Sequence, residues 1–461
     1  MFREKLSSSV YALSFEEVYL APGLSSVEPS QVDLATNFSK NIRLYIPISS
    51  SPMDTVTEEE MAIALALLGG IGVVHRNIPV ERQVEILERV KRAPPIRTRL
   101  MHVSPEDPCF KAVEIMRSSS VRDIPVVSGD RVAGHLYYAD LSENCRDPYQ
   151  VVEKFMRPPK TTNLSKLRDD IKNLLRGYGD TLPVVSGEGL YLGTIVYQDL
   201  FEDYSPVIGK REGLIVGAAI SPFDRERIRK LDPLADALVT DVAHAHNINV
   251  IKALRDVSRE ISSDLVIGNI ASYNAVRDFS EHIDKIDGFR VGLGGGSICS
   301  TPEVSGAYTP TLYAVASVRD AVEDLNLKTP VIADGGIRSS ADIVRSLAAG
   351  ASAVMLGSLL AGTDEASAPL ISFNESMYKP YRGMASKSAM ERRFAVDRYA
   401  RLSKRVAEGV EVIVPYKGSV YKVIRDLVEG VRAGLGYAGA SSIRELWEKA
   451  VFIRARARQL K

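Results

Sequence analysis

A cysteine follows a glycine-rich stretch in this sequence of 461 residues. The stretch reads Gly292-Leu-Gly-Gly-Gly-Ser-Ile-Cys-Ser-Thr301, so four glycines precede Cys299. Glycines leave backbone amides and carbonyls uncovered and allow positive φ angles, so such a loop can cradle a phosphate or an ion. A lone cysteine is more often a small buried hydrophobe, but a Gly/Ser/Thr loop is no apolar core. We therefore expect Cys299 to be a covalent nucleophile.

Two further motifs combine glycine with a polar side chain. Asp334 precedes two glycines, and its carboxylate could accept hydrogen bonds from the two hydroxyls of a ribose. The structural alternative is a helix N-cap, where Asp is common. Gly336 and the pair Gly357-Ser358 follow later strand-like runs, where barrel enzymes usually bind phosphate. Together these motifs favour a nucleoside monophosphate. His244 and His246 have no third ligand at metal spacing, so we expect them to have a packing or supporting role.

Eight apolar runs must position these residues. They alternate with helical patterns such as 80–92 and 340–350, and strands this apolar are typical of a parallel sheet that is buried on both faces. The runs are 42–49, 69–75, 214–220, 237–244, 264–271, 289–295, 330–336 and 353–359. The pattern predicts an α/β protein with a (β/α)₈ barrel, whose active site lies at the C-terminal strand ends. Those ends would also deliver Ser51, Met53, Asp241 and Asn269.

An internal repeat interrupts the barrel pattern. Asp123–Gly129 recurs as Thr181–Gly187, and the offset between Pro125 and Pro183 is 58 residues (183 − 125). Each copy reads as a helix, two strands and a further helix start, at Asp140 in the first copy and Asp199 in the second. We expect an inserted module at 95–204, after the second barrel helix, between barrel parts 1–94 and 205–461.

Composition narrows the class of protein. Lys+Arg and Asp+Glu each number 58, which argues against partners that need a basic surface, such as nucleic acid or an anionic membrane. Only 3 cysteines occur, without a CxxC pair, so neither a disulfide scaffold nor a cysteine-built zinc site is expected, and Cys109 and Cys145 are interpreted as structural. With no signal sequence and no run long enough to span a bilayer, we expect a cytoplasmic protein.

At this point the sequence resembles the inosine-5′-monophosphate (IMP) dehydrogenase family, in the family's order and over essentially the whole chain. The matching segments are MDTVTE (53–58), GGIGVVHRN (69–77), GSICST (296–301), VIADGGIR (331–338), LGSLLAGT (356–363), YRGMASKSAM (381–390) and the run from Glu408 to VPYKG (414–418). The repeat module resembles the family's tandem CBS (Bateman) domain. The sequence departs from the family's pattern at Pro302 and at 306–310.

The resemblance implies an NAD-dependent oxidoreductase of guanine nucleotide biosynthesis. Cys299 would attack the purine C2 of IMP, hydride would leave to the nicotinamide, and the thioimidate would be hydrolysed to XMP beneath a mobile flap. The implied catalytic residues are Cys299, Thr301, Arg398, Tyr399 and Glu408. The implied IMP contacts are Ser51, Met53, Ser297, Asp334, Gly336, Gly357, Ser358, Tyr381, Gly383, Met384 and Glu408. The implied NAD contacts are Asp241, Asn269, Gly292 and Gly294, and the carbonyls of Gly294, Gly296 and Cys299 would hold potassium. The resemblance also implies a homotetramer.

Three alternatives stay open. GMP reductase shares the barrel and the cysteine loop but deaminates GMP to IMP with NADPH; Ala385 and Ser388 favour it, whereas the Arg398-Tyr399 pair favours the dehydrogenase. Arg398 could also be a solvated residue of an Arg-rich helix. The CBS pair could make the protein a sensor of adenine or guanine nucleotides through Asp140 and Asp199, or it could be a scaffold. Tyr137 and Val196 replace the Thr or Ser usual in nucleotide-binding CBS sequences.

Overall fold

The computed structural model describes residues 2–163, 179–197, 206–391 and 409–455. The chain divides into two compact units. The first unit combines Met1–Ala93 with Ser205–Lys461, and the second is Pro94–Tyr204.

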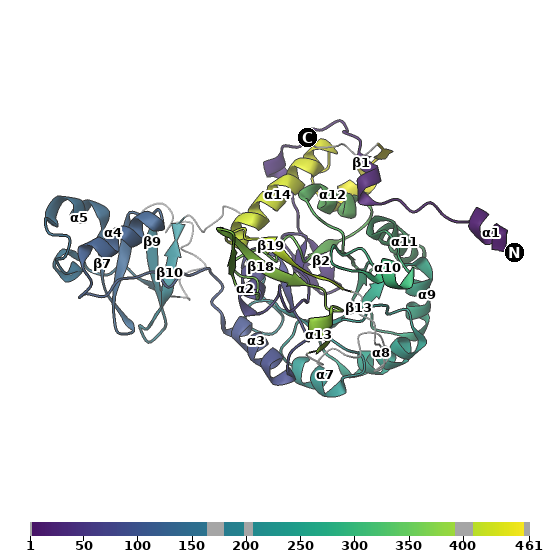
Figure 1. Ribbon diagram of the computed structural model, residues 1–461, viewed down its shortest axis with the longest axis horizontal. Helices are drawn as coiled ribbons and strands as arrows, with labels where there is room; N and C mark the ends of the chain where they lie inside the picture. Colours follow the sequence, from purple (N-terminus) through teal and green to yellow (C-terminus); the bar gives the residue numbers. More distant parts are fainter. Residues whose placement is uncertain (1, 164–178, 198–205, 392–408, 456–461) are drawn as a thin grey trace. The chain divides into compact units, whose positions relative to one another are not determined.

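Eight parallel strands close the first unit into a barrel (Figure 1). Their order is β11-β12-β13-β14-β15-β16-β4-β5, and β4 completes the ring by pairing with both β16 and β5. The strands are β4 (Ile48–Ser50), β5 (Ile71–Val74), β11 (Gly217–Ile220), β12 (Ala237–Thr240), β13 (Asp264–Ile270), β14 (Gly288–Val291), β15 (Val331–Asp334) and β16 (Ala353–Leu356). The predicted (β/α)₈ barrel is confirmed.

A ring of helices surrounds the strands (Figure 1). The helices are α2 (Glu59–Leu67), α3 (Val80–Arg92), α7 (Arg225–Leu231), α8 (Ile248–Glu260), α9 (Tyr273–His282), α11 (Thr311–Asp324), α12 (Ser340–Ala348), α14 (Val420–Tyr437) and α15 (Ile443–Lys449). Several begin at side-chain caps: Ser272 accepts from the Ala275 amide and Ser339 from the Asp342 amide. Helix α3 buries one apolar stripe with Ile86, Leu87 and Val90, whereas α2 is buried over most of its surface.

The first predicted strand, 42–49, is wrong as a single element. Residues Ile42–Leu44 form β3, which pairs antiparallel with β2 (Thr36–Ser39) outside the barrel. The barrel strand β4 begins only at Ile48, because Pro47 has no amide hydrogen to donate and separates the two segments. The β2–β3 hairpin contacts the N-terminal ends of barrel strands, since Ser39 Oγ donates to Asp264 Oδ2 over 2.6 Å.

Smaller elements complete the first unit. An antiparallel sheet contains β17 (Ile371–Phe373), β18 (Ser376–Arg382) and β19 (Glu411–Pro415), and β1 (Val18–Leu20) pairs with β20 (Phe452–Arg454). Short helices are α1 (Phe2–Ser7), α10 (Thr301–Ser305), α13 (Lys387–Glu391) and the 3₁₀ turns η1 (Phe15–Glu17) and η2 (Pro29–Gln31).

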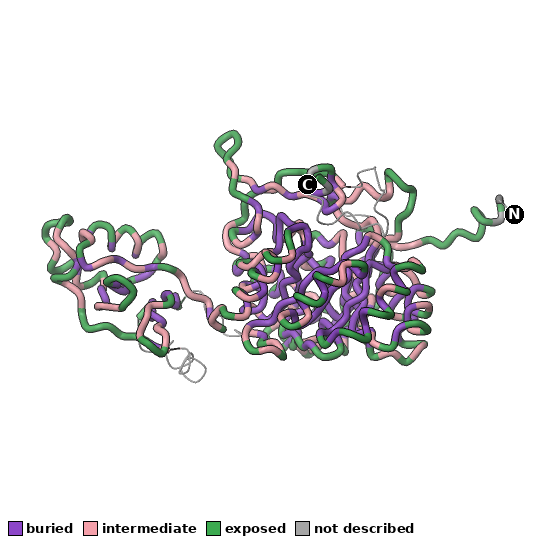
Figure 2. The backbone as a smooth tube through the Cα atoms, turned by 90° about the horizontal axis from the view of Figure 1, so that it is seen from below, coloured by how far each residue is buried: buried purple, intermediate pink, exposed green. Residues whose placement is uncertain are grey.

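The core of the first unit lies inside the barrel and between barrel and helices. Strand residues such as Leu238, Phe289 and Val354 are 0% exposed, and Figure 2 shows the buried segments gathered in the centre of the barrel. None of the helices in the described part of the chain combines the length and apolar character that a membrane span requires. The strands and the helices packed on them fix where each loop after a strand begins and ends.

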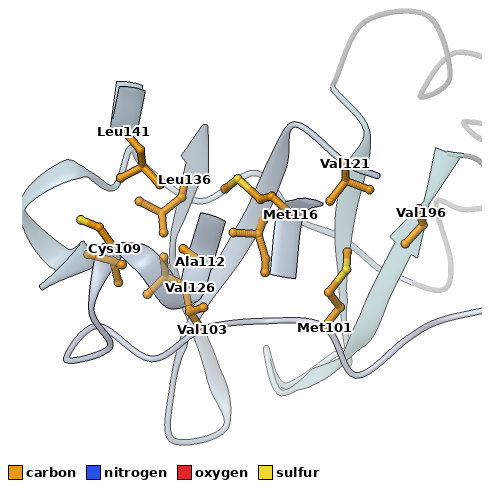
Figure 3. Close-up of a cluster of buried hydrophobic side chains, with 12 residues drawn as sticks. Met101, Val103, Cys109, Ala112, Met116, Val121, Val126, Leu136, Leu141 and Val196 are labelled. Atoms are coloured by element: carbon orange, nitrogen blue, oxygen red, sulfur yellow. The ribbon is translucent and has the colours of Figure 1, made fainter. Parts of the chain in front are cut away.

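The second unit contains both copies of the repeat. The first copy has α4 (Cys109–Ser118), β6 (Asp123–Ser128), β7 (Arg131–Tyr137), α5 (Tyr138–Asn144) and η3 (Val152–Phe155); the second has β8 (Thr162–Asn163), β9 (Thr181–Val185) and β10 (Tyr191–Val196). Helix α5 begins two residues before the predicted start at Asp140. The copies meet where Asp123 accepts hydrogen bonds from the Asp180 amide and the Thr181 hydroxyl. Figure 3 shows the cluster of buried side chains in this unit. Asp199 and the segment predicted as the first helix of the second copy lie outside the described residues.

Candidate active site

A cavity of about 160 Å³ lies at the C-terminal ends of the barrel strands. It brings together most of the residues singled out in the sequence, which come from the last residues of β13, β15 and β18 and from the loops after β4, β14, β15, β16 and β18. The singled-out residues that line it are Ser51, Met53, Asn269, Gly292, Gly294, Gly296, Ser297, Cys299, Thr301, Asp334, Gly336, Gly357, Ser358, Tyr381, Gly383 and Met384. Asp241 does not line it, and Arg398, Tyr399 and Glu408 lie outside the described residues.

Cys299 stands on the loop between β14 and α10. Its thiol donates a hydrogen bond to the Thr301 hydroxyl over 3.2 Å, and both side chains line the cavity. Two backbone hydrogen bonds hold the loop. The Cys299 amide donates to the Gly296 carbonyl within the loop, and the Val410 amide, from the segment before β19, donates to the Ile298 carbonyl. A thiol that lies beside a hydroxyl in the lining of a cavity can attack an electrophilic carbon of a bound ligand.

The glycines of this loop are required by close approaches of the backbone. A Cβ on Gly292, at φ 153°, would lie 1.9 Å from the Asp334 carbonyl oxygen, and one on Gly295 would lie 2.5 Å from Thr311 Oγ1. The loop therefore packs directly on the turn after β15. Gly335 and Gly336 of that turn have φ angles of 98° and 76°, a region that suits glycine.

A buried polar network underlies the cavity. Arg290, on β14, donates from Nε to Asp334 Oδ2 over 2.8 Å and pairs through Nη1 with Asp241 Oδ1 at 3.3 Å. Arg76 pairs with the other Asp241 oxygen at 3.5 Å, and Asn269 Nδ2 donates to Asp334 Oδ2 over 2.9 Å. Buried charges persist only when they are paired, so this network fixes the Asp334 carboxylate in one orientation.

Arg290 is a residue that the sequence reasoning missed. A charged side chain in the middle of an otherwise apolar barrel strand (Phe289-Arg-Val291) was the available signal, because such a group needs a buried partner. Asp241, expected to contact a cofactor, is 0% exposed and its carboxylate faces two arginines. Its direct contact with a cofactor therefore stays a prediction.

The opposite side of the cavity suits an anionic group. A Cβ on Gly357 would lie 2.7 Å from the Tyr381 hydroxyl and 3.2 Å from Met53 Sδ. Because Gly357 has no side chain, Tyr381 and Met53 can approach its backbone closely. Burial raises the pKa of Tyr381 above its usual value, as does the nearby Asp334, although a hydrogen bond with Ser297 opposes the change. Tyr381 thus keeps its proton and can donate a hydrogen bond.

A second ion pair ties the loop after β4 to β18. Arg382 binds the Asp54 carboxylate with two hydrogen bonds, Nε–Oδ1 at 2.9 Å and Nη2–Oδ2 at 2.6 Å, and Asn77 Nδ2 donates to Asp54 Oδ2 over 2.9 Å. Burial alone would raise the pKa of Asp54, but the Arg382 and Asn77 contacts lower it below its usual value. This pair positions Met53 and Tyr381, which both line the cavity.

His244 and His246 belong to no group of possible metal ligands among the described residues. His246 Nε2 lies 2.7 Å from Asp278 Oδ2 on α9, and burial lowers the pKa of His244 below its usual value. Within the described ranges no group of three or more His, Cys, Asp or Glu side chains could hold a metal ion.

The fold and this cavity define a (β/α)₈-barrel enzyme with a glycine-rich cysteine loop at the carboxyl ends of the strands. Residues 12–461 match the family model for the IMP dehydrogenase / GMP reductase domain. The chain belongs to this family, and the resemblance noted in the sequence is confirmed.

Relatives extend over nearly the whole chain. The chain is 44% identical to the inosine-5′-monophosphate dehydrogenase of Korarchaeum cryptofilum, covering 95% of this chain and 93% of that protein. It is 41% identical to the enzyme of the same name from Thermoplasma acidophilum, covering 98% and 94%. Among solved structures, a GMP reductase variant from Trypanosoma brucei in complex with guanosine 5′-monophosphate has a TM-score of 0.70 and 34% identity, covering 98% of this chain and 97% of that chain.

Proposed function

We propose that this protein oxidises IMP to XMP with NAD as hydride acceptor and so serves guanine nucleotide biosynthesis. The observation that carries the proposal is the placement of the Cys299 thiol in one cavity with Asp334, Gly357 and Ser358. A reactive sulfur beside groups suited to a ribose and a phosphate is the arrangement that a purine nucleotide substrate requires. The relatives named IMP dehydrogenase support the choice of IMP.

Substrate binding is assigned to the two sides of the cavity. One oxygen of Asp334, Oδ2, accepts from both Arg290 and Asn269. Its other oxygen points to the ribose hydroxyls in our proposal. The phosphate is assigned to the backbone amides of Gly336 and Gly357 with the hydroxyls of Ser358 and Tyr381, because uncovered amides and neutral hydroxyls donate to an anion without steric conflict.

Cys299 begins the reaction as a thiolate that adds to C2 of the hypoxanthine ring. Thr301 Oγ1, at 3.2 Å from the sulfur, is the group placed to handle the thiol proton. The C2–H bond then breaks with its electron pair, which leaves as hydride, and the purine stays bonded to sulfur as a thioimidate. Water attacks the same carbon, the C–S bond breaks, and XMP and the free thiol result.

Asn269 is a fitting contact for NAD, which when bound accepts the hydride. The side-chain Oδ1 of Asn269 is buried at the cavity without a hydrogen-bond partner in the described part of the chain, while Nδ2 is fixed by Gly292 and Asp334. A buried acceptor of this kind calls for a donor from a ligand, such as a carboxamide N–H or a ribose hydroxyl. Gly292 and Gly294 line the same cavity and are assigned to NAD as well.

Hydrolysis of the thioimidate is assigned to Arg398, Tyr399 and Glu408, which match the family's water-activating groups and lie outside the described residues. An arginine is almost always protonated, so a role as base requires burial and a neighbouring acceptor, which Tyr399 would supply. The carbonyls of Gly294, Gly296 and Cys299 are assigned to a potassium ion. All three residues line the cavity, and Gly294 has a φ of 77°, a conformation that suits glycine.

GMP reductase is the second candidate, favoured by the likeness to the solved Trypanosoma brucei structures. The two functions differ in nucleotide and in cofactor redox state. The test is to supply IMP with NAD or GMP with NADPH and to follow nicotinamide absorbance. We expect NADH to form from IMP and no NADPH to be consumed with GMP. Consumption of NADPH with release of ammonia would instead establish the reductase.

For the second unit we propose a CBS pair that binds an adenine or guanine nucleotide at Asp140. In the structure this carboxylate is paired with Arg157, at 2.6 Å from Nε and 2.5 Å from Nη2, and Arg157 also lies over the Tyr137 ring at 5.0 Å. A ribose would have to displace Arg157, which could then bind a phosphate. Calorimetric titration of ATP and GTP into the protein and into an Asp140→Asn variant tests this. If neither protein gives a heat of binding, the second unit has only a scaffold role.

We also propose a homotetramer. Exposed apolar side chains on the β17–β18–β19 sheet, such as Phe373 at 59%, Met377 at 40% and Ile413 at 47%, support an assembled form in which this sheet is covered. Light scattering coupled to size-exclusion chromatography tests it, and a mass of one chain at micromolar concentration would contradict it.

A further inference from the structure

Two cysteines outside the catalytic cavity meet in the second unit. Cys109 is the first residue of α4, and Cys145 follows the last residue of α5. Both side chains line one cavity, and Cys145 packs against the buried cluster that contains Cys109. Cys145 Sγ donates a hydrogen bond to the Asp147 carbonyl over 3.1 Å. Neither cysteine is in a disulfide in this structure. A disulfide would require the two sulfur atoms to approach to a bond length of about 2.05 Å.

Both cysteines are held by their backbones. The Cys109 amide donates to the Gln150 carbonyl over 2.8 Å, and the Cys145 amide donates to the Leu141 carbonyl over 3.0 Å. Cys109 belongs to the buried cluster of this unit, at the same end as Leu141 (Figure 3), and Cys145 packs against that cluster. The packing of α4 and α5 therefore fixes the positions of the two cysteine backbones, and side-chain rotation alone does not bring the thiols together.

A cavity of about 580 Å³ gives access to the pair. Both cysteines line it, together with apolar side chains that include Phe110 and Leu141. Phe110 is 46% exposed and Tyr138, another lining residue, is 37% exposed, so the cavity opens to solvent. Its polar wall carries Glu114 and Arg117, charges that a small zwitterionic or anionic thiol compound can contact. A small reagent can thus reach sulfur atoms that are otherwise covered.

We propose that Cys109 and Cys145 form a dithiol site that is oxidised to an intramolecular disulfide by a low-molecular-weight disulfide. Cys145, which is partly exposed, attacks one sulfur of the reagent as a thiolate and releases one small thiol. Cys109 then gives up its proton and attacks the Cys145 sulfur of the mixed disulfide, which releases the second small thiol. Two protein S–H groups and one small disulfide become one protein S–S bond and two small thiols, and two electrons pass to the reagent.

The difference in burial sets the order of these steps. Burial raises the pKa of the Cys109 thiol above its usual value, and the neighbouring Cys145 side chain raises it further. A thiol with such a pKa is a poor first nucleophile at neutral pH, because only the thiolate attacks. Cys109 is 2% exposed, so it meets the reagent only after Cys145 has brought it to the cavity. Attack by Cys109 then converts the mixed disulfide at Cys145 into the intramolecular disulfide, so the protein retains no adduct with the reagent.

The disulfide would join the start of α4 to the end of α5 and enclose residues 109–145. That loop contains the β6–β7 hairpin, so the bond would restrain most of the first repeat in the unfolded chain. It would also draw together two walls of the cavity. We expect the oxidised second unit to resist proteolysis between 109 and 145 more than the reduced unit does.

The test uses the full chain with Cys299→Ala, which leaves Cys109 and Cys145 as its only thiols. It is equilibrated with oxidised and reduced glutathione at several ratios, the free thiols are alkylated, and the intact mass is measured. We expect both alkylation sites to disappear together, with no retained glutathione and with full recovery on reduction. Two thiols that stay alkylated, or independent glutathione adducts, would overturn the proposal.

Matched variants separate the two roles. With Cys109→Ser added, Cys145 should hold a stable glutathione adduct, because its resolving partner is gone. With Cys145→Ser added, Cys109 should stay unmodified over the same period. In the natural chain, peptide mapping should find a peptide linked through 109 and 145. A linkage between two chains, or rapid adduct formation at Cys109 without Cys145, would contradict the assignment.

Discussion

Arg290 and Asp334 form a buried ion pair in the lining of the cavity at the carboxyl ends of the barrel strands. Arg290 Nε donates to Asp334 Oδ2 over 2.8 Å, and the two side chains are 5% and 13% exposed. The same guanidinium reaches Asp241, which Arg76 also pairs, so two arginines and two carboxylates form one buried network. The network holds Asp334 in the cavity lining, and we predict that Arg290 is a positioning residue for a ligand bound there.

Replacing this arginine by lysine should impair substrate binding more than catalysis. Lysine keeps the charge but lacks the planar fork that reaches Asp334 and Asp241 together. We expect the KM for IMP in Arg290→Lys to rise about tenfold or more, as for loss of one charged hydrogen bond, while kcat changes less. Steady-state kinetics measures both. Arg225→Lys, at an exposed pair with Glu260, is the control and should match the natural protein. A fall in kcat with unchanged KM would refute the positioning role.

Removal of the thiol at 299 separates binding from chemistry. Because Asp334, Gly357 and Ser358 are untouched, Cys299→Ala should bind IMP with nearly unchanged affinity in calorimetry. Turnover, followed by NADH absorbance, should fall about 10⁴-fold or more, as when other nucleophiles are removed. Cys299→Ser should be similarly inactive, since a hydroxyl is a much weaker acid than a thiol. Residual turnover near the natural rate would exclude Cys299 as the nucleophile.

The sequence predicts the barrel and the place of the cavity because both follow from short-range rules. Apolar strands that alternate with amphipathic helices, and polar residues directly after each strand, suffice to place Cys299 near Asp334. The extent of β4 was missed because an apolar run does not reveal where Pro47 interrupts hydrogen bonding. Arg290 and Asp54 were missed because their partners, Asp334 and Arg382, are 44 and 328 residues distant. Cys145, likewise, comes to line one cavity with Cys109 only through the packing of α4 and α5.

The glycine loop offers a test of the packing that positions Cys299. A Cβ at Gly292 would meet the Asp334 carbonyl oxygen at 1.9 Å, whereas the nearest atom to a Cβ at Gly296 lies at 3.5 Å. Gly292→Ala should therefore lower the free energy of unfolding of the barrel by about 3 kcal/mol or prevent its folding. Gly296→Ala in the same loop should change it by less than about 1 kcal/mol. Urea unfolding followed by the fluorescence of Trp447, the one tryptophan of the chain, measures both. Equal losses would disprove the close approach.

Arg398 can be tested by separating the two chemical steps. If it activates water, Arg398→Ala should leave hydride transfer fast and slow hydrolysis, which gives a burst of NADH followed by slow turnover. Arg401→Ala changes a neighbouring arginine of the same segment and should show no burst. Stopped-flow absorbance records both phases. Equal slowing of the two steps in Arg398→Ala would assign the residue a structural role.

The Asp54–Arg382 pair predicts how the stability of the barrel depends on pH. The pKa of Asp54 lies below its ordinary value of 3.8, so the folded state binds this proton less readily than the unfolded chain. The pair therefore contributes its full stability above pH 3.8 and loses it as the pH falls through the lower folded pKa. At neutral pH, Asp54→Asn should lower the free energy of unfolding by about 3 kcal/mol, because the Arg382 guanidinium loses its carboxylate. The difference between natural protein and variant should shrink below about pH 4. Asp426→Asn, at an exposed pair with Lys422, should show almost no difference at any pH. A constant difference for Asp54→Asn down to pH 2 would show that the ion pair is not its source.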